Sequence, residues 1–115
     1  MSGDTVFEKI LRREISAAIV FEDECVLAFK DISPQAPSHV LVIPKKKAKH
    51  FTEMGEWASK DVGDFITRIA KVAMKLNLDK DGYRVVFNCG QNGGQTVEYI
   101  HAHILGGKPL NINMA

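Results

Sequence analysis

The spacing of apolar positions predicts two helices of unequal length. Residues 5–14 place Phe7 and Ile10 at helical spacing on one side, which indicates a short helix with Asp4 as its N-cap. Residues 56–76 carry apolar side chains at steps of three and four positions with charges between them. This period predicts one long amphipathic helix.

Five shorter segments have the patterns of strands. Residues 18–23 and 25–31 are short apolar or alternating runs around an acidic turn, which predicts a hairpin. Residues 39–44 contain four consecutive β-branched or leucine residues, as expected of a strand buried on both faces. Residues 83–88 and 97–105 alternate and predict two further strands. The order of helix, three strands, helix and two strands favours an α+β domain with an antiparallel sheet.

Length and charge narrow the classes of function. The 115 residues, 45% of them hydrophobic, suit a single domain spanning residues 1–115. Fifteen basic and fourteen acidic residues leave a net charge of +1, so neither a nucleic-acid polymer nor a membrane surface is expected as a partner. The lysine-rich residues 45–49 predict a solvated loop, with a nuclear-import signal or a phosphate-steering patch as alternatives.

The sequence also predicts a cytoplasmic protein, with a nuclear location as the alternative offered by the lysine run. The N-terminal residues lack the uninterrupted apolar stretch of a signal peptide, and no window approaches the roughly 20 apolar residues of a membrane span. Cys25 and Cys89 are single and widely spaced, so we interpret them as reduced thiols.

Two histidines one residue apart suggest chemistry at the last predicted strand. Alternation along a strand would place Tyr99, His101 and His103 in a polar row on the face opposite the core. One explanation is an exposed sheet face with ordinary polar residues. A second is a zinc site completed by His39 or His50, and hence a zinc-dependent structural module.

A third explanation is a phosphate site beside the histidines. The glycine-rich segment before them contains Gly90, Gly93 and Gly94, followed by the hydroxyl of Thr96. Backbone N–H groups of such a turn can converge on an anion because no Cβ blocks its approach. A strand that aims two imidazoles at the same place strengthens this explanation.

The run GGQTVEYIHAHILGG resembles the signature of the histidine triad (HIT) family, His-φ-His-φ-His-φ-φ with φ apolar. The segment DISPQAPSHVLVIPK is similar to the upstream part of its Hint branch, and the likeness covers roughly residues 4–108. It implies a five-stranded antiparallel sheet with one long and one short helix, and two such sheets joined in a homodimer. It also implies a purine nucleoside monophosphate or phosphoramidate as ligand, and no cofactor or metal.

The implied activity is hydrolysis of the P–N bond of adenosine or guanosine 5′-phosphoramidates through a covalent nucleotidyl-histidine. His101 matches the nucleophile, and the carbonyl of Tyr99 would hold its Nδ1 proton. The catalytic positions that the resemblance implies are His39, Thr96, His101 and His103. The phosphate, ribose and purine contacts it implies, besides His101 and His103, are Asn88, Gly94, Thr96, Asp31, Phe7, Ile10, Val20, Phe29 and Ile32.

Each assignment has a structural alternative. Asp31 could cap a turn, Asn88 could bond its own backbone, and Phe7, Val20 and Phe29 could be plain core. Two departures from the family pattern also matter.

Tyr99 replaces the first triad histidine, and the last residues, 111–115, replace a Trp-Pro-Pro-Gly ending. Tyr99 can donate a hydrogen bond but cannot shuttle protons at neutral pH. The alternative function is therefore a nucleotide-binding interaction or regulatory protein with vestigial hydrolase activity.

Overall fold

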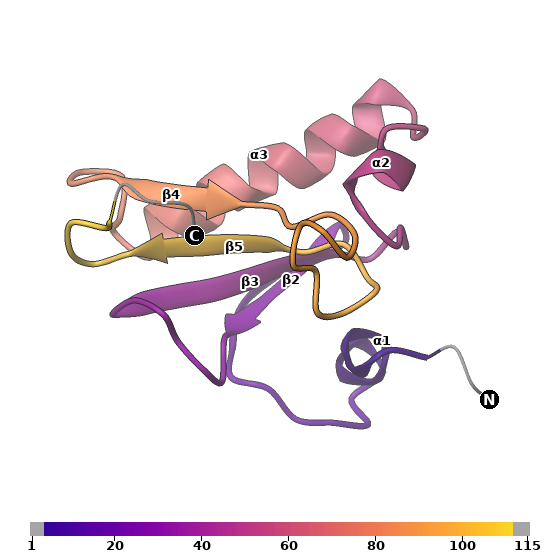
Figure 1. The fold of residues 1–115 in the computed structure, drawn as a ribbon, viewed down its shortest axis with the longest axis horizontal. Helices are drawn as coiled ribbons and strands as arrows, with labels where there is room; N and C mark the ends of the chain where they lie inside the picture. Colours follow the sequence, from indigo (N-terminus) through magenta and orange to yellow (C-terminus); the bar gives the residue numbers. More distant parts are fainter. Residues whose placement is uncertain (1–3, 112–115) are drawn as a thin grey trace.

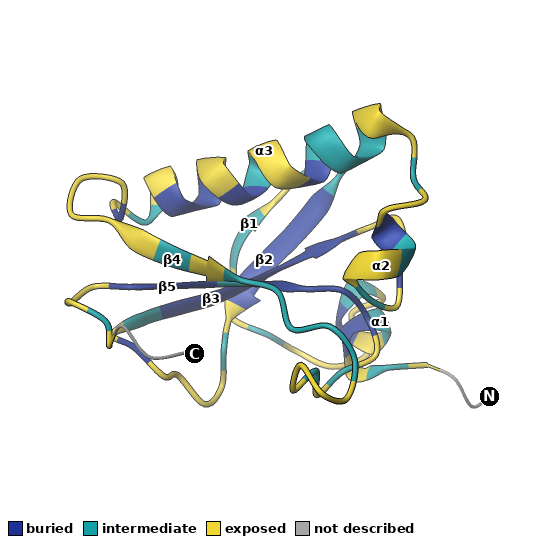
Figure 2. Ribbon diagram, turned by 45° about the horizontal axis from the view of Figure 1, so that its top comes forward, coloured by how far each residue is buried: buried dark blue, intermediate teal, exposed yellow. Residues whose placement is uncertain are grey.

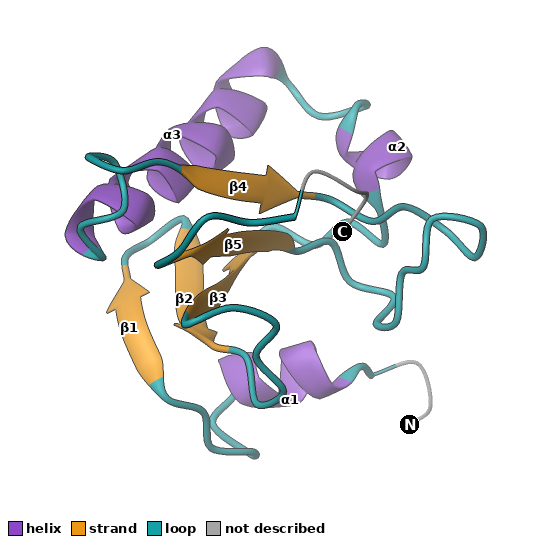
Figure 3. Cartoon of the chain, turned by 60° about the vertical axis from the view of Figure 1, so that its left-hand side comes forward, coloured by secondary structure: helices purple, strands orange, loops and turns teal. Residues whose placement is uncertain are grey.

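Five strands form one antiparallel sheet in the order β1-β2-β3-β5-β4. Figure 1 labels β2, β3, β5 and β4. In this computed structural model the described residues are 4–111, so the divergent tail at 112–115 lies outside them. The bounds are β1 Ile19–Glu22, β2 Val26–Lys30, β3 Ser38–Pro44, β4 Tyr83–Val86 and β5 Ala102–Gly106. β1 and β4 are the two edge strands (Figure 3). The predicted five-stranded antiparallel sheet and α+β class are confirmed.

Three helices accompany the sheet. The long helix, α3, spans Ser59–Lys75 and begins three residues later than predicted. The first, α1, spans Val6–Leu11, and its N-cap is Thr5 in a capping box with Glu8 rather than Asp4. A four-residue helix, α2 Phe51–Met54, was not predicted, because it is too short to show a helical period.

The two faces of the sheet carry separate apolar clusters. α3 covers one face and α1 lies on the other, with the buried stripe of α3 turned toward the strands (Figure 2). On β3, Val40 and Val42 join the α3 cluster, whereas Leu41 and Ile43 join the α1 cluster. This alternation explains why β3 is apolar along almost its whole length.

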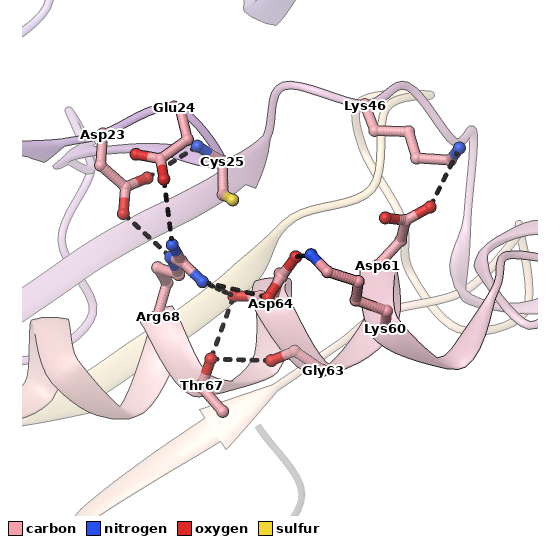
Figure 4. A network of polar contacts seen from close by, with 10 residues as sticks. All are labelled: Asp23, Glu24, Cys25, Lys46, Lys60, Asp61, Gly63, Asp64, Thr67 and Arg68. Carbon is pink, nitrogen blue, oxygen red and sulfur yellow. Dashed lines mark hydrogen bonds and ion pairs between the residues drawn. The ribbon is translucent and has the colours of Figure 1, made fainter.

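An ionic network ties α3 to the β1–β2 hairpin (Figure 4). Arg68 on α3 reaches Asp23 in the hairpin turn at 2.9 Å and Asp64 on its own helix at 3.3 Å. Asp23 also accepts the backbone N–H groups of Cys25 and Val26, which closes the acidic turn. The acidic residues of the turn therefore anchor the hairpin to the helix that covers it.

The lysine-rich segment is held in place by ion pairs with three different elements. Lys45 pairs with Glu22 of β1, and Lys46 pairs with Asp61 of α3. Lys47 pairs with Glu8 of α1 at 2.9 Å. These lysines bind carboxylates of the chain itself, which weakens both a nuclear-import signal and a phosphate-steering patch as explanations. Within residues 4–111, no helix has the length and apolarity to cross a membrane.

The last strand is shorter than predicted. β5 begins at Ala102, and residues 97–101 approach it as irregular backbone instead of a paired strand. The row formed by Tyr99 and His101 is not an exposed face, because Tyr99 is 1% exposed and His101 is 4% exposed. An exposed face with ordinary polar histidines is thereby excluded.

Candidate functional site

The histidines lie on the α1 face of the sheet. Ala102 and Ile104 of β5 are fully buried in the α3 cluster, so His103 between them faces the other way. His103 lies opposite Leu41 of β3 in the strand register, and His39 lies opposite Leu105. Adjacent antiparallel strands therefore bring the upstream histidine and the HxH pair together.

His101 is held in one tautomer by the main chain. Its Nδ1 lies 2.8 Å from the carbonyl oxygen of Tyr99, which can only accept a hydrogen bond. Nδ1 therefore carries the proton, and Nε2 keeps its lone pair. Burial lowers the pKa of His101 below its usual value, although the bond to the Tyr99 carbonyl partly opposes this. The imidazole is accordingly neutral and nucleophilic at pH 7.

A chain of hydrogen bonds fixes the tautomers of the other two histidines. The backbone N–H of Gln35 donates to Nδ1 of His39 at 3.0 Å, so that nitrogen accepts and His39 carries its proton on Nε2. This Nε2 lies 2.9 Å from Nδ1 of His103, which must then be the acceptor. His103 consequently carries its own proton on Nε2.

His103 is a hydrogen-bond donor rather than an acid at neutral pH. Burial, together with the neighbouring His101 and His39, lowers the pKa of His103 to about 4. A neutral imidazole can donate its Nε2–H to an oxygen, but losing that proton would leave an unstable anion. A hydrogen bond from His103 to a phosphate oxygen therefore fits this site better than protonation of a leaving nitrogen.

Asp31 follows β2 and lies next to His39. Its Oδ1 accepts the backbone N–H of Ser33 at 2.7 Å, as the turn-capping alternative predicted. Its Oδ2 lies 3.4 Å from Nε2 of His39, which is long for a hydrogen bond. One carboxylate oxygen of Asp31 thus closes a turn, while the other lies near His39.

Asp31, His39 and His103 could also bind a metal ion together. One ligand atom from each lies within 4.8 Å of the others, and two imidazoles with a carboxylate suit zinc. Binding would require the hydrogen bond between His39 and His103 to break, because it uses the lone pair of His103 Nδ1. The zinc site predicted from the HxH pair differs from this group, because His101 and His50 are not among the three residues whose ligand atoms lie within 4.8 Å of one another.

A cavity of about 520 Å³ opens beside His39 and His103. His39 and His103 line one part of it, and Asn88, Gly93 and Gly94 line another. Gly94 has a φ of +78°, which other residues rarely adopt. A Cβ at Gly93 would lie 2.4 Å from the carbonyl oxygen of Cys89, so no larger residue fits there. The glycines allow the loop to fold tightly at the cavity, as the phosphate explanation requires.

Tyr99 belongs to the core, which corrects its predicted place in a polar row. Its hydroxyl donates to the carbonyl of Pro44 at 2.5 Å, and burial raises the pKa of the phenol. Its ring lies edge-on to Phe7 of α1. Phe7 also packs edge-on against the imidazole of His101, with centroids 4.9 Å apart. The phenol of Tyr99 therefore packs in the core, and the backbone carbonyl of Tyr99 accepts the hydrogen bond from His101.

The residues predicted to surround the purine are not brought together as one pocket. Phe7, Ile10 and Phe29 are buried in the α1 cluster. Val20 packs instead against the α3 cluster, and Ile32 is 98% exposed next to Asp31. Among these five predicted positions, Ile32 has the most exposed side chain, and the purine contacts stay predictions.

The predicted phosphate contacts are partly brought together. Asn88 and Gly94 line the cavity of the histidines, and Asn88 also donates to the carbonyl of Gly93 at 2.9 Å. Thr96 lines a separate cavity of about 290 Å³, so its phosphate contact stays a prediction. Sequence reasoning missed Gln35, which acts through its backbone N–H and therefore leaves no signal in residue type.

The HIT domain family model matches residues 12–110. A purine nucleoside phosphoramidase of Escherichia coli (strain K12) is 44% identical, covering 100% of this chain and 97% of the relative. A 14 kDa zinc-binding protein of Zea mays is 45% identical, covering 93% of this chain and 84% of the relative. These similarities extend across the histidines, the glycine-rich loop and the segment upstream of β3.

Solved structures agree with the sequence matches. A HIT family hydrolase from Legionella pneumophila Philadelphia 1 superposes with a TM-score of 0.89 at 42% identity, covering 95% of this chain and 97% of its own. A HIT family hydrolase from Clostridium thermocellum gives a TM-score of 0.89 at 40% identity, with 100% of both chains covered. The fold, the arrangement of histidines and these full-length matches show that the chain belongs to the HIT domain family.

Proposed function

We propose that the protein is a purine nucleoside phosphoramidase that hydrolyses the P–N bond of adenosine or guanosine 5′-phosphoramidates. One observation carries the proposal: the neutral imidazole of His101 keeps its Nε2 lone pair beside His103, which lines the cavity and can donate from Nε2. The relative from Escherichia coli, named for the same activity, supports the reaction class.

The reaction proceeds by two displacements at phosphorus. Nε2 of His101 bonds to phosphorus while the P–N bond breaks and the departing nitrogen takes a proton from solvent, which gives a neutral amine and a cationic N-phosphoryl imidazole. The carbonyl of Tyr99 stabilises that charge through the proton on Nδ1. Nε2–H of His103 donates to a phosphate oxygen, where negative charge gathers in each transition state. Water then attacks phosphorus, loses a proton to solvent and releases neutral His101, so inversion twice gives net retention.

We infer that the nucleotide is bound by groups in this cavity and beside it. Asn88 and the backbone of Gly94 are positioned to contact the phosphate, and the carboxylate of Asp31 is available for the ribose hydroxyls. The exposed side chain of Ile32 offers an apolar surface to the purine. A hydroxyl contact from Thr96 would require the nucleotide to reach beyond the cavity of the histidines.

Release of amine from a fluorogenic adenosine 5′-phosphoramidate tests the proposed reaction. An enzyme releases amine and AMP over many turnovers at a rate proportional to its concentration. Tight binding of AMP without amine release would instead identify the nucleotide-binding interaction protein that the Tyr99 replacement left open.

The activity should persist at mildly acidic pH. The pKa of His101 is lowered by burial, so its lone pair survives when an ordinary histidine, with a pKa of about 6.5, would be half protonated. We expect kcat/KM to stay level as pH falls from 8 through 6.5 and to decline below that value. A pH profile with its acidic midpoint at or above 6.5 would contradict this assignment.

The free energy of unfolding should also fall as the pH falls. The pKa of His103 falls to about 4 in the folded protein, so the unfolded chain binds a proton that the folded protein does not. The free energy of unfolding should therefore fall as pH drops from about 6.5 toward 4, and urea titrations across that range measure it. A His103→Gln variant should lose part of this dependence.

We propose that two chains form a homodimer by pairing their β4 edges. β4 bonds to β5 on one side, and Tyr83 and Val85 expose apolar side chains at this edge. Within residues 4–111 no strand pairs with the outer side of β4, and such edges are usually covered in proteins. Pairing of two β4 strands would extend the sheet continuously from one chain into the next.

Val85→Lys should convert the dimer to a monomer in light scattering, because it places a charge at the shared edge. Ile19→Lys is the matched control, since Ile19 is similarly exposed on the opposite edge strand, β1. A monomeric wild-type protein, or dissociation caused by the Ile19 variant instead, would contradict pairing through β4.

We also propose a cytoplasmic location. Cys25 and Cys89 are both free thiols, as expected in a reducing compartment. Mass spectrometry of protein isolated in the presence of an alkylating agent should find both cysteines alkylated, as expected of reduced thiols.

A further inference from the structure

The side-chain amide of Gln95 uses all of its bonding groups inside the protein. Its Oε1 accepts the backbone N–H of Gly90 at 2.9 Å. Its Nε2 donates to the carbonyl of Lys49 at 2.6 Å and to the carbonyl of Val97 at 2.9 Å. The orientation of the amide is determined by its partners, because the reverse orientation would set donor against donor and acceptor against acceptors.

These bonds close the neck of the glycine-rich loop, which is the point where Gly90 and Gln95 meet. The backbone N–H of Gln95 donates to the carbonyl of Gly90 at 3.1 Å, so the two residues are joined both by main chain and by side chain. The loop between them carries Gly93 and Gly94 to the cavity of the histidines. The side-chain amide of Asn88 donates a hydrogen bond to the carbonyl of Gly93. The loop is therefore fixed at its neck and again at the cavity.

The same amide connects the loop to the segment that orients the nucleophile. Val97 is two residues before Tyr99, whose carbonyl holds Nδ1 of His101. Lys49 follows Ala48, whose carbonyl accepts the backbone N–H of Ile100 at 2.8 Å. Gln95 thus joins the glycine-rich loop, the lysine-rich turn and the approach to β5 at one point.

We propose that Gln95 is a positioning residue for phosphoryl transfer, holding the phosphate-binding loop in register with the strand that carries His101. This inference rests on the proposed function. Gln95 lines a different cavity from His39 and His103, so it acts through the backbone around it rather than on the substrate. Nucleophilic attack requires phosphorus and Nε2 at near-bonding distance, and a small misplacement can reduce the rate about a hundredfold.

Gln95→Glu removes the two donors while keeping the size of the side chain. The carbonyls of Lys49 and Val97 would repel the new carboxylate and displace it from the Gly90 N–H that it would otherwise bind. We expect kcat to fall between about tenfold and a hundredfold, with a smaller rise in KM. Faster hydrogen exchange of the Gly90 amide should accompany this loss, while the melting temperature of the protein stays close to that of the wild type.

Gln91→Glu is the matched control. It introduces the same charge into the same loop, and the Gln91 side chain makes no hydrogen bond within the described residues. Equal losses of kcat in both variants would overturn the proposal, because charge alone would explain them. Unchanged kcat or unchanged Gly90 exchange in Gln95→Glu would also overturn it.

A failure of the proposed function can be recognised separately. If the wild-type protein released no amine from adenosine or guanosine phosphoramidates, the phosphoramidase assignment would fail. The positioning role would then be judged by AMP affinity and by Gly90 exchange. Weaker AMP binding with faster exchange in Gln95→Glu, but not in Gln91→Glu, supports the role; any other pattern rejects it.

Discussion

His101→Asn should reduce kcat/KM for an adenosine 5′-phosphoramidate by about 10⁴-fold or more, as expected when an enzyme loses its nucleophile. Asparagine can still donate to the carbonyl of Tyr99, so the local backbone retains its partner. It has no imidazole lone pair to attack phosphorus. The loss should therefore appear in kcat, while AMP affinity stays within about tenfold of the wild-type value. Steady-state amine release and calorimetric AMP titration measure the two effects.

His50→Asn provides the control for this substitution. His50 is the N-cap of α2 and accepts from Glu53 through Nδ1, a role that asparagine also performs well. It lies outside the cavity of His39 and His103, so its replacement should leave kcat/KM near the wild-type value. Activity of His101→Asn within tenfold of the wild type would rule out nucleophilic catalysis by this residue.

Phe7→Ala should destabilise the protein by about 3 to 5 kcal/mol, the usual range for losing a buried phenylalanine. Phe7 is 5% exposed and packs edge-on against Phe29, Tyr99 and His101. The substitution leaves a cavity beside the His101 ring and removes its contact with α1. We therefore expect kcat to fall as well, even at temperatures where the variant remains folded. Urea unfolding and amine release measure the two losses.

Val6→Ala separates a general effect on α1 from the loss of this contact. Val6 precedes Phe7 in the same helix but is 40% exposed, so its truncation should change stability by less than about 0.5 kcal/mol. If Phe7→Ala changed KM for the purine nucleotide while leaving kcat and stability intact, Phe7 would be part of a purine pocket instead of the core beneath His101.

The parts of the fold that follow from strong periodicity could be predicted from sequence. The repeat in residues 56–76 predicted α3, and the apolar run at 39–44 predicted β3 with both faces buried. The resemblance carried by the last histidines predicted the sheet and the family, and the chain belongs to that family. These predictions succeed because the burial of many apolar side chains outweighs the conformational preference of any single residue.

The details of the site depend on contacts that residue type does not encode. Tyr99 alternates correctly with His101, but the strand has not yet begun there, and the phenol turns into the core to reach Pro44. The tautomer of His39 depends on a backbone N–H of Gln35, which any residue except proline could supply. Thr96 is close to the glycines in sequence, yet the loop carries it toward a different cavity.

Mass spectrometry of protein quenched during turnover tests the central claim most directly. After rapid mixing with an adenosine 5′-phosphoramidate and denaturation at alkaline pH, the proposed mechanism predicts one adenylyl group on the peptide that contains His101. His101→Asn should carry none. An adenylyl group attached to another residue, or steady turnover with no covalent adduct at any quench time, would contradict the mechanism.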